Sequence, residues 1–262
     1  MKWLLILFFT SLLTTQAQQS STQSISLICD EFYGVDDFEN LYYSTNNVLY
    51  KKSPTDRMEF YDLQLGDIAS VDIINPLKIL VFYRDMQTIV FLDNRLNEQL
   101  RLNLNTLQPQ RFIEHARLAG ERRLWLYNMD MSRLELYDYV NNRLINSTTP
   151  ISNPVVKMQC DYNFCHLITS NSIISFNTYA SETSRISAEV QFPVAYNFEL
   201  LVYKNSNGWK WYRFDKEFRF SESELKQPIS KEYVPESLYI KGNKLYIYNR
   251  NRLIVDTINL KK

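Results

Sequence analysis

Short apolar runs separated by polar turns recur along the whole chain. The stretch Leu80–Asn94 (LVFYRDMQTIVFLDN) has an apolar arm, a polar turn and a second apolar arm, and a similar stretch, LWLYNMDMSRLELYD, begins at Leu124. Apolar residues at every second position, as in Leu134–Tyr137, follow the two-residue rhythm of a strand. Only Phe112–Ala119 (FIEHARLA) also fits a helix, and it fits a strand equally well. The pattern therefore predicts β-hairpins.

The hairpin occurs six times, at intervals of about 40 residues, which is a typical length for one unit of a repeat fold. Its equivalent positions are Tyr43, Tyr83, Tyr127, Ile168, Tyr203 and Tyr248. Each unit has room for about four strands. Around the opening stretch we predict strands at Ser70–Asn75, Lys78–Tyr83, Thr88–Leu92 and Gln99–Leu104. Four-stranded antiparallel sheets repeated around an axis form a β-propeller.

The sequence thus predicts one all-β domain over residues 18–262, a six-bladed β-propeller of four-stranded antiparallel blades. The last unit, from about Glu232 to Leu260, has three clear strands. We expect the N-terminal segment Ser24–Ile28 to pair with it and close the ring, which would remove exposed sheet edges. Two β-sandwiches are the competing fold, because they also contain short strands and frequent turns.

The first residues have the features of a secretory signal peptide. Lys2 is followed by the apolar run LLILFF and by a small residue, Ala17, at a suitable cleavage position. The alternative is a membrane anchor, but the apolar run is shorter than the roughly 20 residues that span a bilayer. We therefore predict cleavage after residues 1–17, no transmembrane span in the mature chain, and export to the periplasm.

Charge and composition narrow the function classes. The chain has 29 basic and 29 acidic residues, which argues against a nucleic-acid surface, since such a surface needs an excess of basic residues. Glycine is scarce, with five residues, and asparagine-rich turns such as Asn46-Asn47, Asn141-Asn142 and Asn249-Arg250-Asn251 take its place. Asparagine tolerates the left-handed backbone better than most residues that have a side chain.

No catalytic or metal constellation is visible in the sequence, so we predict neither an enzyme nor a cofactor. The two histidines, His115 and His166, lie in apolar strand segments without a second ligand at metal spacing. Trp209 and Trp211 share one face of a predicted strand. That face could stack on a sugar, but packing against the next blade is the more common reason for such a pair.

Two cysteines form a candidate disulfide. Cys160 and Cys165 flank a four-residue turn, so they are expected on the two arms of one hairpin, where facing cysteines come close enough to bridge. An oxidising compartment would permit the bond. A buried pair of free thiols is the alternative, and Cys29 has no evident partner.

The polar turns of the hairpins are candidate partner-binding loops. They should gather at one end of a propeller, where a ring of different loops on a rigid platform suits protein recognition. The loop residues we single out are Arg84, Asp85, Asp130, Arg250 and Arg252. The alternative function is a carbohydrate-binding or carbohydrate-cleaving propeller, which would need an open channel mouth with carboxylates and aromatics from different blades. A narrow channel lined by apolar residues would dismiss it.

One passage carries a family resemblance. Asn75–Leu100 (NPLKILVFYRDMQTIVFLDNRLNEQL) is similar to a segment of small propeller-like Bacteroidetes proteins, and the leader ending TQA-QQ looks like those of envelope proteins of that phylum. Within that group the chain resembles the PorD-type accessory subunits of the type IX secretion translocon. The resemblance implies a noncatalytic periplasmic scaffold subunit that is held at the outer membrane by protein partners.

Overall fold

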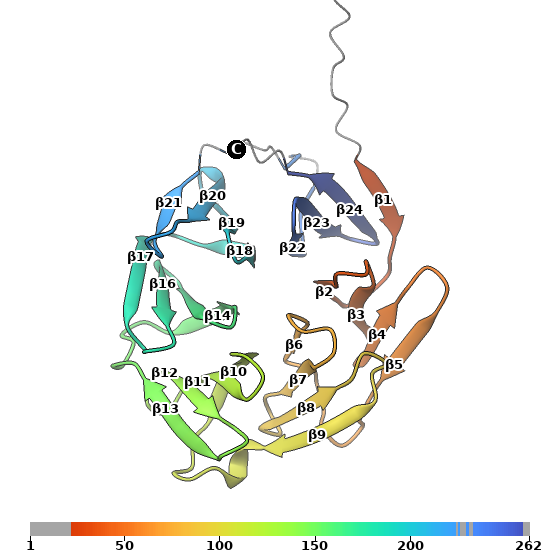
Figure 1. Cartoon of the computed structure of the whole chain (residues 1–262). Coiled ribbons are helices and arrows are strands. Elements are labelled where there is room, and N and C mark those ends of the chain that lie inside the picture. The colour runs from red at the N-terminus through yellow and green to blue at the C-terminus, as the bar shows by residue number, and fades with distance from the viewer. Residues whose placement is uncertain (1–21, 224, 226–228, 231–232, 259–262) are drawn as a thin grey trace, which may run out of the picture.

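Each hairpin of the sequence pattern forms the two middle strands of a four-stranded antiparallel sheet. The computed structural model describes residues 22–258 except 224, 226–228 and 231–232, so the predicted signal peptide lies outside the described residues. Six such sheets stand in a ring (Figure 1), which confirms the predicted six-bladed β-propeller. We name the strands of each blade A to D, from the centre of the ring outwards.

The strand bounds follow chain order. Blade 1 contains β2 (Glu31–Val35), β3 (Leu41–Thr45), β4 (Val48–Lys52) and β5 (Arg57–Phe60). Blade 2 contains β6 (Ser70–Asp72), β7 (Ile79–Tyr83), β8 (Thr88–Leu92) and β9 (Glu98–Asn103), followed by the short 3-10 helix η1 (Leu104–Thr106). Blade 3 contains β10 (Ile113–Leu118), β11 (Arg123–Asn128), β12 (Arg133–Asp138) and β13 (Arg143–Ser147). The ambiguous FIEHARLA segment is therefore a strand.

The second half of the ring repeats this order. Blade 4 contains β14 (Val155–Cys160), β15 (Phe164–Thr169), β16 (Ser172–Asn177) and β17 (Glu182–Ser187). Blade 5 contains β18 (Gln191–Asn197), β19 (Leu200–Asn205), β20 (Gly208–Phe214) and β21 (Phe220–Glu222). Blade 6 contains β22 (Ser237–Lys241), β23 (Lys244–Asn249) and β24 (Arg252–Thr257), and β1 (Gln23–Ser26) from the N-terminal side is its strand D.

The ring closes as the sequence predicted. β1 pairs antiparallel with β24, with Ile25 opposite Leu253. Beyond β1, the Leu27 N–H donates to the Asn251 carbonyl oxygen at 3.1 Å, and the Leu27 side chain is buried between blades 6 and 1. One blade is therefore made from both ends of the described chain, and its outer edge is provided by the first described strand.

The core consists of six apolar clusters, one at each contact between neighbouring blades in the described part of the chain. Strand β7 shows why its sequence is continuously apolar. Leu80 and Phe82 pack towards blade 3, while Ile79, Val81 and Tyr83 pack towards blade 1. Both faces of a blade are covered, so strict alternation with polar residues would place polar groups in the core.

Tight turns join the strands with few glycines. Asn46 and Asn47, between β3 and β4, have φ values of 50° and 64°, as a type I′ hairpin turn requires. Asn142 has φ 51°. In the Asn249-Arg250-Asn251 turn, however, Arg250 adopts the left-handed backbone, with φ 47°, so asparagine is not the residue that replaces glycine there.

Antiparallel order gives the ring two different faces. Turns between strands B and C, and the segments that connect one blade to the next, lie on one face, which we call the hairpin face. Turns between A and B and between C and D lie on the other, which we call the opposite face. On that face Asp93 caps the β8–β9 turn by accepting hydrogen bonds from the N–H groups of Arg95 at 2.7 Å and Asn97 at 2.9 Å.

Candidate functional site

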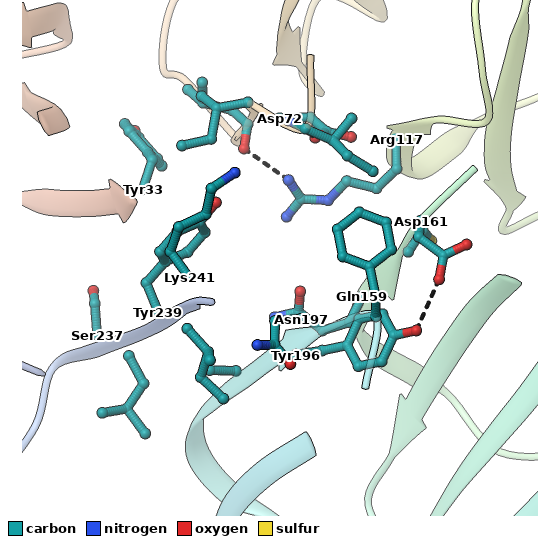
Figure 2. A pocket seen from close by; sticks show the side chains of 18 of the residues that line it. Tyr33, Asp72, Arg117, Gln159, Asp161, Tyr196, Asn197, Ser237, Tyr239 and Lys241 are labelled. Atoms are coloured by element: carbon teal, nitrogen blue, oxygen red, sulfur yellow. Dashed lines mark hydrogen bonds between the residues drawn. The ribbon is translucent and has the colours of Figure 1, made fainter. Parts of the chain in front are cut away.

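The six A strands enclose a central channel with a cavity of about 620 Å³, and every one of them contributes lining residues. The cavity runs from the beginnings of β2 and β22 to the A–B turns of the opposite face. Figure 2 shows polar side chains from several blades around it. The polar and charged lining residues include Glu31, Tyr33, Asp72, Arg117, Lys157, Gln159, Asn197, Ser237, Tyr239 and Lys241.

Two of the three lining cations and one lining carboxylate interact electrostatically across the channel. Arg117 is on β10, Lys157 is on β14 and Glu31 is on β2, so three different blades provide them. Arg117 Nη1 donates to the Val71 carbonyl oxygen at 2.7 Å, and the guanidinium reaches into the cavity (Figure 2). The Lys157 ammonium lies 5.9 Å from the centre of the Phe192 ring.

These groups influence one another's protonation. Burial lowers the pKa of Lys157, the positive charge of Arg117 lowers it further, and Glu31 opposes both effects. Burial also raises the pKa of Glu31, although Lys157 and Arg117 favour its charged form. The channel reaches solvent at Glu31, yet surrounding protein replaces much of the water that would solvate these charges.

The wall between blades 1 and 6 depends on a close backbone approach. Gly34, with φ +140°, lies against the ring of Tyr239, and a Cβ atom at residue 34 would be 2.5 Å from Tyr239 Cε2. A side chain at this position would therefore be strained and would also displace Tyr239. The glycine is needed here because Tyr239 forms part of the channel lining.

The channel does not exclude the alternative function of a carbohydrate-binding or carbohydrate-cleaving propeller. It is hollow, and its lining mixes apolar side chains with carboxylates (Glu31, Asp72) and aromatics (Tyr33, Tyr239) from different blades. The Asp72 carboxylate, however, is used by the fold. Its oxygens accept hydrogen bonds from the Ile74 N–H at 3.1 Å and the Leu118 N–H at 2.9 Å.

The predicted loop residues divide between two parts of the hairpin face. Arg84 and Asp85 lie in the β7–β8 turn and Asp130 in the β11–β12 turn, on neighbouring blades. Arg250 lies in the β23–β24 turn and Arg252 begins β24, across the ring on blade 6 (Figure 1). Arg84 makes ion pairs with Glu114 at 2.9 Å and Asp85 at 3.5 Å. Partner binding by these residues stays a prediction.

Exposed apolar side chains adjoin the first group, and the sequence pattern did not predict them. Met86, Phe112, Met129 and Met131 are 48%, 37%, 56% and 52% exposed, respectively. We call these four residues the hairpin patch. Methionine inside otherwise polar turns (YRDMQT, NMDMSR) is the signal that could have identified three of them.

Hydrogen bonds hold the segments of the hairpin patch together. The Met129 N–H donates to the Phe112 carbonyl oxygen at 2.9 Å, and the Phe112 N–H donates to Asp130 Oδ2 at 2.7 Å. Gln87, next to Met86, accepts from the Ile113 N–H and donates to the Ile113 carbonyl oxygen, both at 2.8 Å. The turns of blades 2 and 3 and the segment before β10 therefore form one fixed surface.

Cys160 and Cys165 are directly opposite each other on β14 and β15, as the hairpin pattern predicted. Both are free thiols in this structure, and Cys160 lines the channel. Burial raises the pKa of both thiols. The paired positions agree with either of the two alternatives, and the disulfide stays a prediction.

His166 and the tryptophan pair have packing roles. His166 is fully buried, its Nδ1 is 2.8 Å from Ser175 Oγ, and its ring packs edge-on against Tyr196, Phe214 and Phe220. Trp211 is buried in the cluster between blades 5 and 6, and Trp209 packs against it. This confirms the expected core packing of the tryptophan pair.

Buried His166 should make the protein sensitive to acid. Burial lowers the pKa of His166 from 6.5 to about 3. Between these two values the unfolded chain binds a proton that the folded protein does not, so the free energy of unfolding falls as the pH falls. We expect His166 to lower the free energy of unfolding by about 2 to 3 kcal/mol as the pH falls from 7 to 4.5. Urea unfolding at several pH values would measure this change.

The variant His166→Phe provides the comparison. It leaves the Ser175 hydroxyl without its partner, but that cost does not depend on pH. Between pH 7 and pH 4.5, we expect the unfolding free energy of the variant to fall by about 2 to 3 kcal/mol less than that of the wild type. Parallel curves for the two proteins would show that His166 is not the titrating group.

Two further features are absent from the described part of residues 22–258. No group of three or more His, Cys, Asp or Glu side chains is placed to share a metal ion. No described helix has the length and apolar character needed to cross a bilayer.

Comparison with known proteins defines the class by fold. No protein-family model matches the chain, and no curated protein sequence matches it. The chain is similar in structure to a streptogramin B lyase (8% identity, 91% of this chain and 98% of that chain, TM-score 0.55). It is also similar to a catalytically inactive virginiamycin B lyase from Staphylococcus aureus with quinupristin (13% identity, 92% of this chain and 90% of that chain, TM-score 0.58). A third similar structure is BamB from Moraxella catarrhalis (11% identity, 89% of this chain and 85% of that chain, TM-score 0.53).

These likenesses show a β-propeller and no more, because the sequence identities are low. The neighbours include lyases as well as WD40 repeats, so the fold alone does not decide between catalysis and binding. The function has to be inferred from the channel and the surface of this chain.

Proposed function

We propose that this protein is an exported, noncatalytic scaffold subunit that binds a folded protein partner through its hairpin face. The supporting observation is the hairpin patch. Four large apolar side chains lie exposed on loops that hydrogen bonds hold in place. Methionine and aromatic residues are enriched at protein interfaces, and methionine adapts its shape to a partner surface.

Charges around the patch suit the rim of such an interface. Arg84, Asp85, Glu114 and Asp130 come from the same turns or from the beginning of β10. Rim charges of this kind orient the approaching partner and add little to the final affinity. The sequence-predicted Arg84, Asp85 and Asp130 would then select the partner, and the apolar residues would hold it.

The partner we propose is an outer-membrane or periplasmic complex, in the first place a secretion translocon. This follows the resemblance of Asn75–Leu100 to PorD-type subunits and the predicted signal peptide. The same segment contains the β7–β8 turn with Met86. The part of the sequence that resembles a secretion subunit therefore contributes to the proposed interface.

A substitution on each face tests the proposal. Met129 and Val140 belong to the same blade and are 56% and 57% exposed, but Val140 lies in the β12–β13 turn on the opposite face. In Met129→Glu a buried, unpaired charge would oppose docking. We expect it to weaken partner binding about 30-fold, which corresponds to roughly 2 kcal/mol. Val140→Glu should bind as the wild type does.

The measurement is recovery of envelope proteins with the tagged protein after gentle solubilisation of its native host. Wild-type protein and Val140→Glu should bring the same partner proteins at equal yield, and Met129→Glu should lose them. Recovery of the wild type as a free monomer would refute the proposal. If Val140→Glu lost its partners and Met129→Glu kept them, the interface would lie on the opposite face.

A carbohydrate-binding propeller is the second candidate. The hollow channel, which contains carboxylates and aromatics from several blades, favours it. This function would use the channel and not the hairpin patch, so the two candidates are separable by mutation.

A further inference from the structure

The channel contains cationic hydrogen-bond donors that lack protein acceptors. A guanidinium has five N–H donors, and Arg117 uses Nη1 for the Val71 carbonyl oxygen. Within the described part of the chain it makes no ion pair, and the Lys157 ammonium makes neither an ion pair nor a hydrogen bond. Charged donors inside a protein gain much from an ionised acceptor, and a carboxylate can accept two of them at once.

The charged lining groups that form no ion pair in the described structure favour an acceptor with a single negative charge. Arg117, Lys157 and Glu31 together carry a charge of +1 when all three are ionised. Three other carboxylates and one other cation line the cavity, but all four are bonded to the fold. Glu199 pairs with Arg213 at 3.6 Å, and Lys241 pairs with Asp37 at 2.7 Å. Asp72 accepts from backbone N–H groups, and Asp161 accepts from the Asn163 N–H at 2.7 Å and the Tyr196 hydroxyl at 2.8 Å.

The remainder of the wall suits hydroxyl groups. Ser237 and Tyr239 on β22 present hydroxyls, and Gln159 on β14 presents an amide whose nitrogen also donates to the Val194 carbonyl oxygen at 3.2 Å. The Asn197 amide on β18 donates to the Gly242 carbonyl oxygen at 3.1 Å and accepts from the Leu200 N–H at 2.9 Å, so only its second amide hydrogen and remaining lone pair can meet a ligand. Figure 2 shows Gln159 and Asn197 on the side of the cavity that faces the Arg117 guanidinium. A volume of about 620 Å³ falls within the range of pockets that hold small molecules.

We propose that the central channel is a binding site for a small hydroxylated monocarboxylate of the sugar-acid class. The carboxylate lies between Arg117 and Lys157, and the hydroxyl groups meet the amides and hydroxyls across the channel. This site is independent of docking at the hairpin patch, and it narrows the carbohydrate candidate to an acidic sugar.

Titration calorimetry with three matched sugars tests the proposal. D-glucuronate, D-glucose and D-glucosamine have similar size and hydroxyl groups but carry negative, zero and positive charge. We expect glucuronate to bind at least tenfold more tightly than the other two, and more weakly as salt is added. Absence of glucuronate binding, equal binding of glucose, or a preference for glucosamine would overturn it.

Substitutions locate the site. Lys157→Met removes a group without hydrogen bonds in the described structure, so the fold should survive, and glucuronate affinity should fall at least tenfold. Arg117→Met should have a similar effect. Lys210→Met is the control, because Lys210 on β20 is not part of the channel lining and pairs with Glu222 at 2.9 Å. The glucuronate affinity of this variant should stay within twofold of the wild type. Unchanged affinity in Lys157→Met would exclude this site.

The two proposals fail separately. Met129→Glu should bind glucuronate like the wild type, and Lys157→Met should retain the envelope partners. A Met129→Glu protein that loses both activities would show that the channel and the hairpin patch are coupled, which would contradict the independence of the sites.

Discussion

A chain that begins at Ile28, and therefore lacks β1 and Leu27, is expected to lose about 3 to 5 kcal/mol of unfolding free energy relative to one that begins at Thr22. It gives up the burial of Leu27 and the partial burial of Ile25 in the cluster between blades 6 and 1. It also gives up pairing with β24, which leaves that strand as an exposed edge. Urea unfolding followed by circular dichroism measures the loss.

Two single substitutions separate burial from pairing. Leu27→Ala removes a side chain that is 4% exposed and should account for about 2 to 3 kcal/mol of the loss. Ser24→Ala changes an exposed residue of β1 and should stay within about 0.5 kcal/mol of the reference chain. If the shortened chain unfolded at the same urea concentration as the reference, closure through β1 would not stabilise the ring.

Loss of a buried ion pair should destabilise the protein by a similar amount. Arg111 precedes β10 and its Nη1 lies 2.5 Å from Glu135 Oε2, with the two side chains 3% and 0% exposed. Arg111→Met leaves the Glu135 carboxylate buried with Arg133 and Asn128 as its remaining partners. We expect a loss of about 3 kcal/mol in urea unfolding, the lower end for such pairs, because part of the network persists.

An exposed arginine provides the matched control. Arg101 pairs with Glu98 at 2.6 Å and with Asp62 at 2.8 Å, but its side chain is 38% exposed. Arg101→Met should therefore cost less than about 1 kcal/mol. The double variant Arg111→Met/Glu135→Gln should recover part of the loss, since it also removes the unpaired charge. Equal losses for Arg111→Met and Arg101→Met would show that burial does not strengthen the pair.

The blades could be predicted from sequence because strands B and C are apolar on both faces. Ile79–Tyr83 and Thr88–Leu92 are buried at every position, so the hairpins appear as repeated apolar runs. Closure by the N-terminal segment was also predictable, since the last unit had three strands and a spare strand was available. Residue Leu104, predicted at the end of a strand, begins η1 instead, where Asn103 caps the turn.

The channel could not be predicted in the same way. Glu31, Arg117 and Lys157 are far apart in the sequence and meet only because the ring closes. Strand A also has a weaker pattern, with mixed burial in β10 and β14, because its inner edge borders the lumen and not another strand. The hairpin patch was not predicted for a different reason. Its methionines lie among charged residues, in turns whose sequence is typical of solvent-exposed loops.

The position of β1 determines when the ring can be completed. β1 is the first described strand to be synthesised, and its neighbour β24 is the last. Nearly the whole polypeptide must therefore leave the ribosome before these two ends can meet. Such a long separation slows the final folding step, because the ends of a long loop must first find each other. Until blade 6 assembles, the edges of β1 and β24 that face each other in the finished protein stay unpaired.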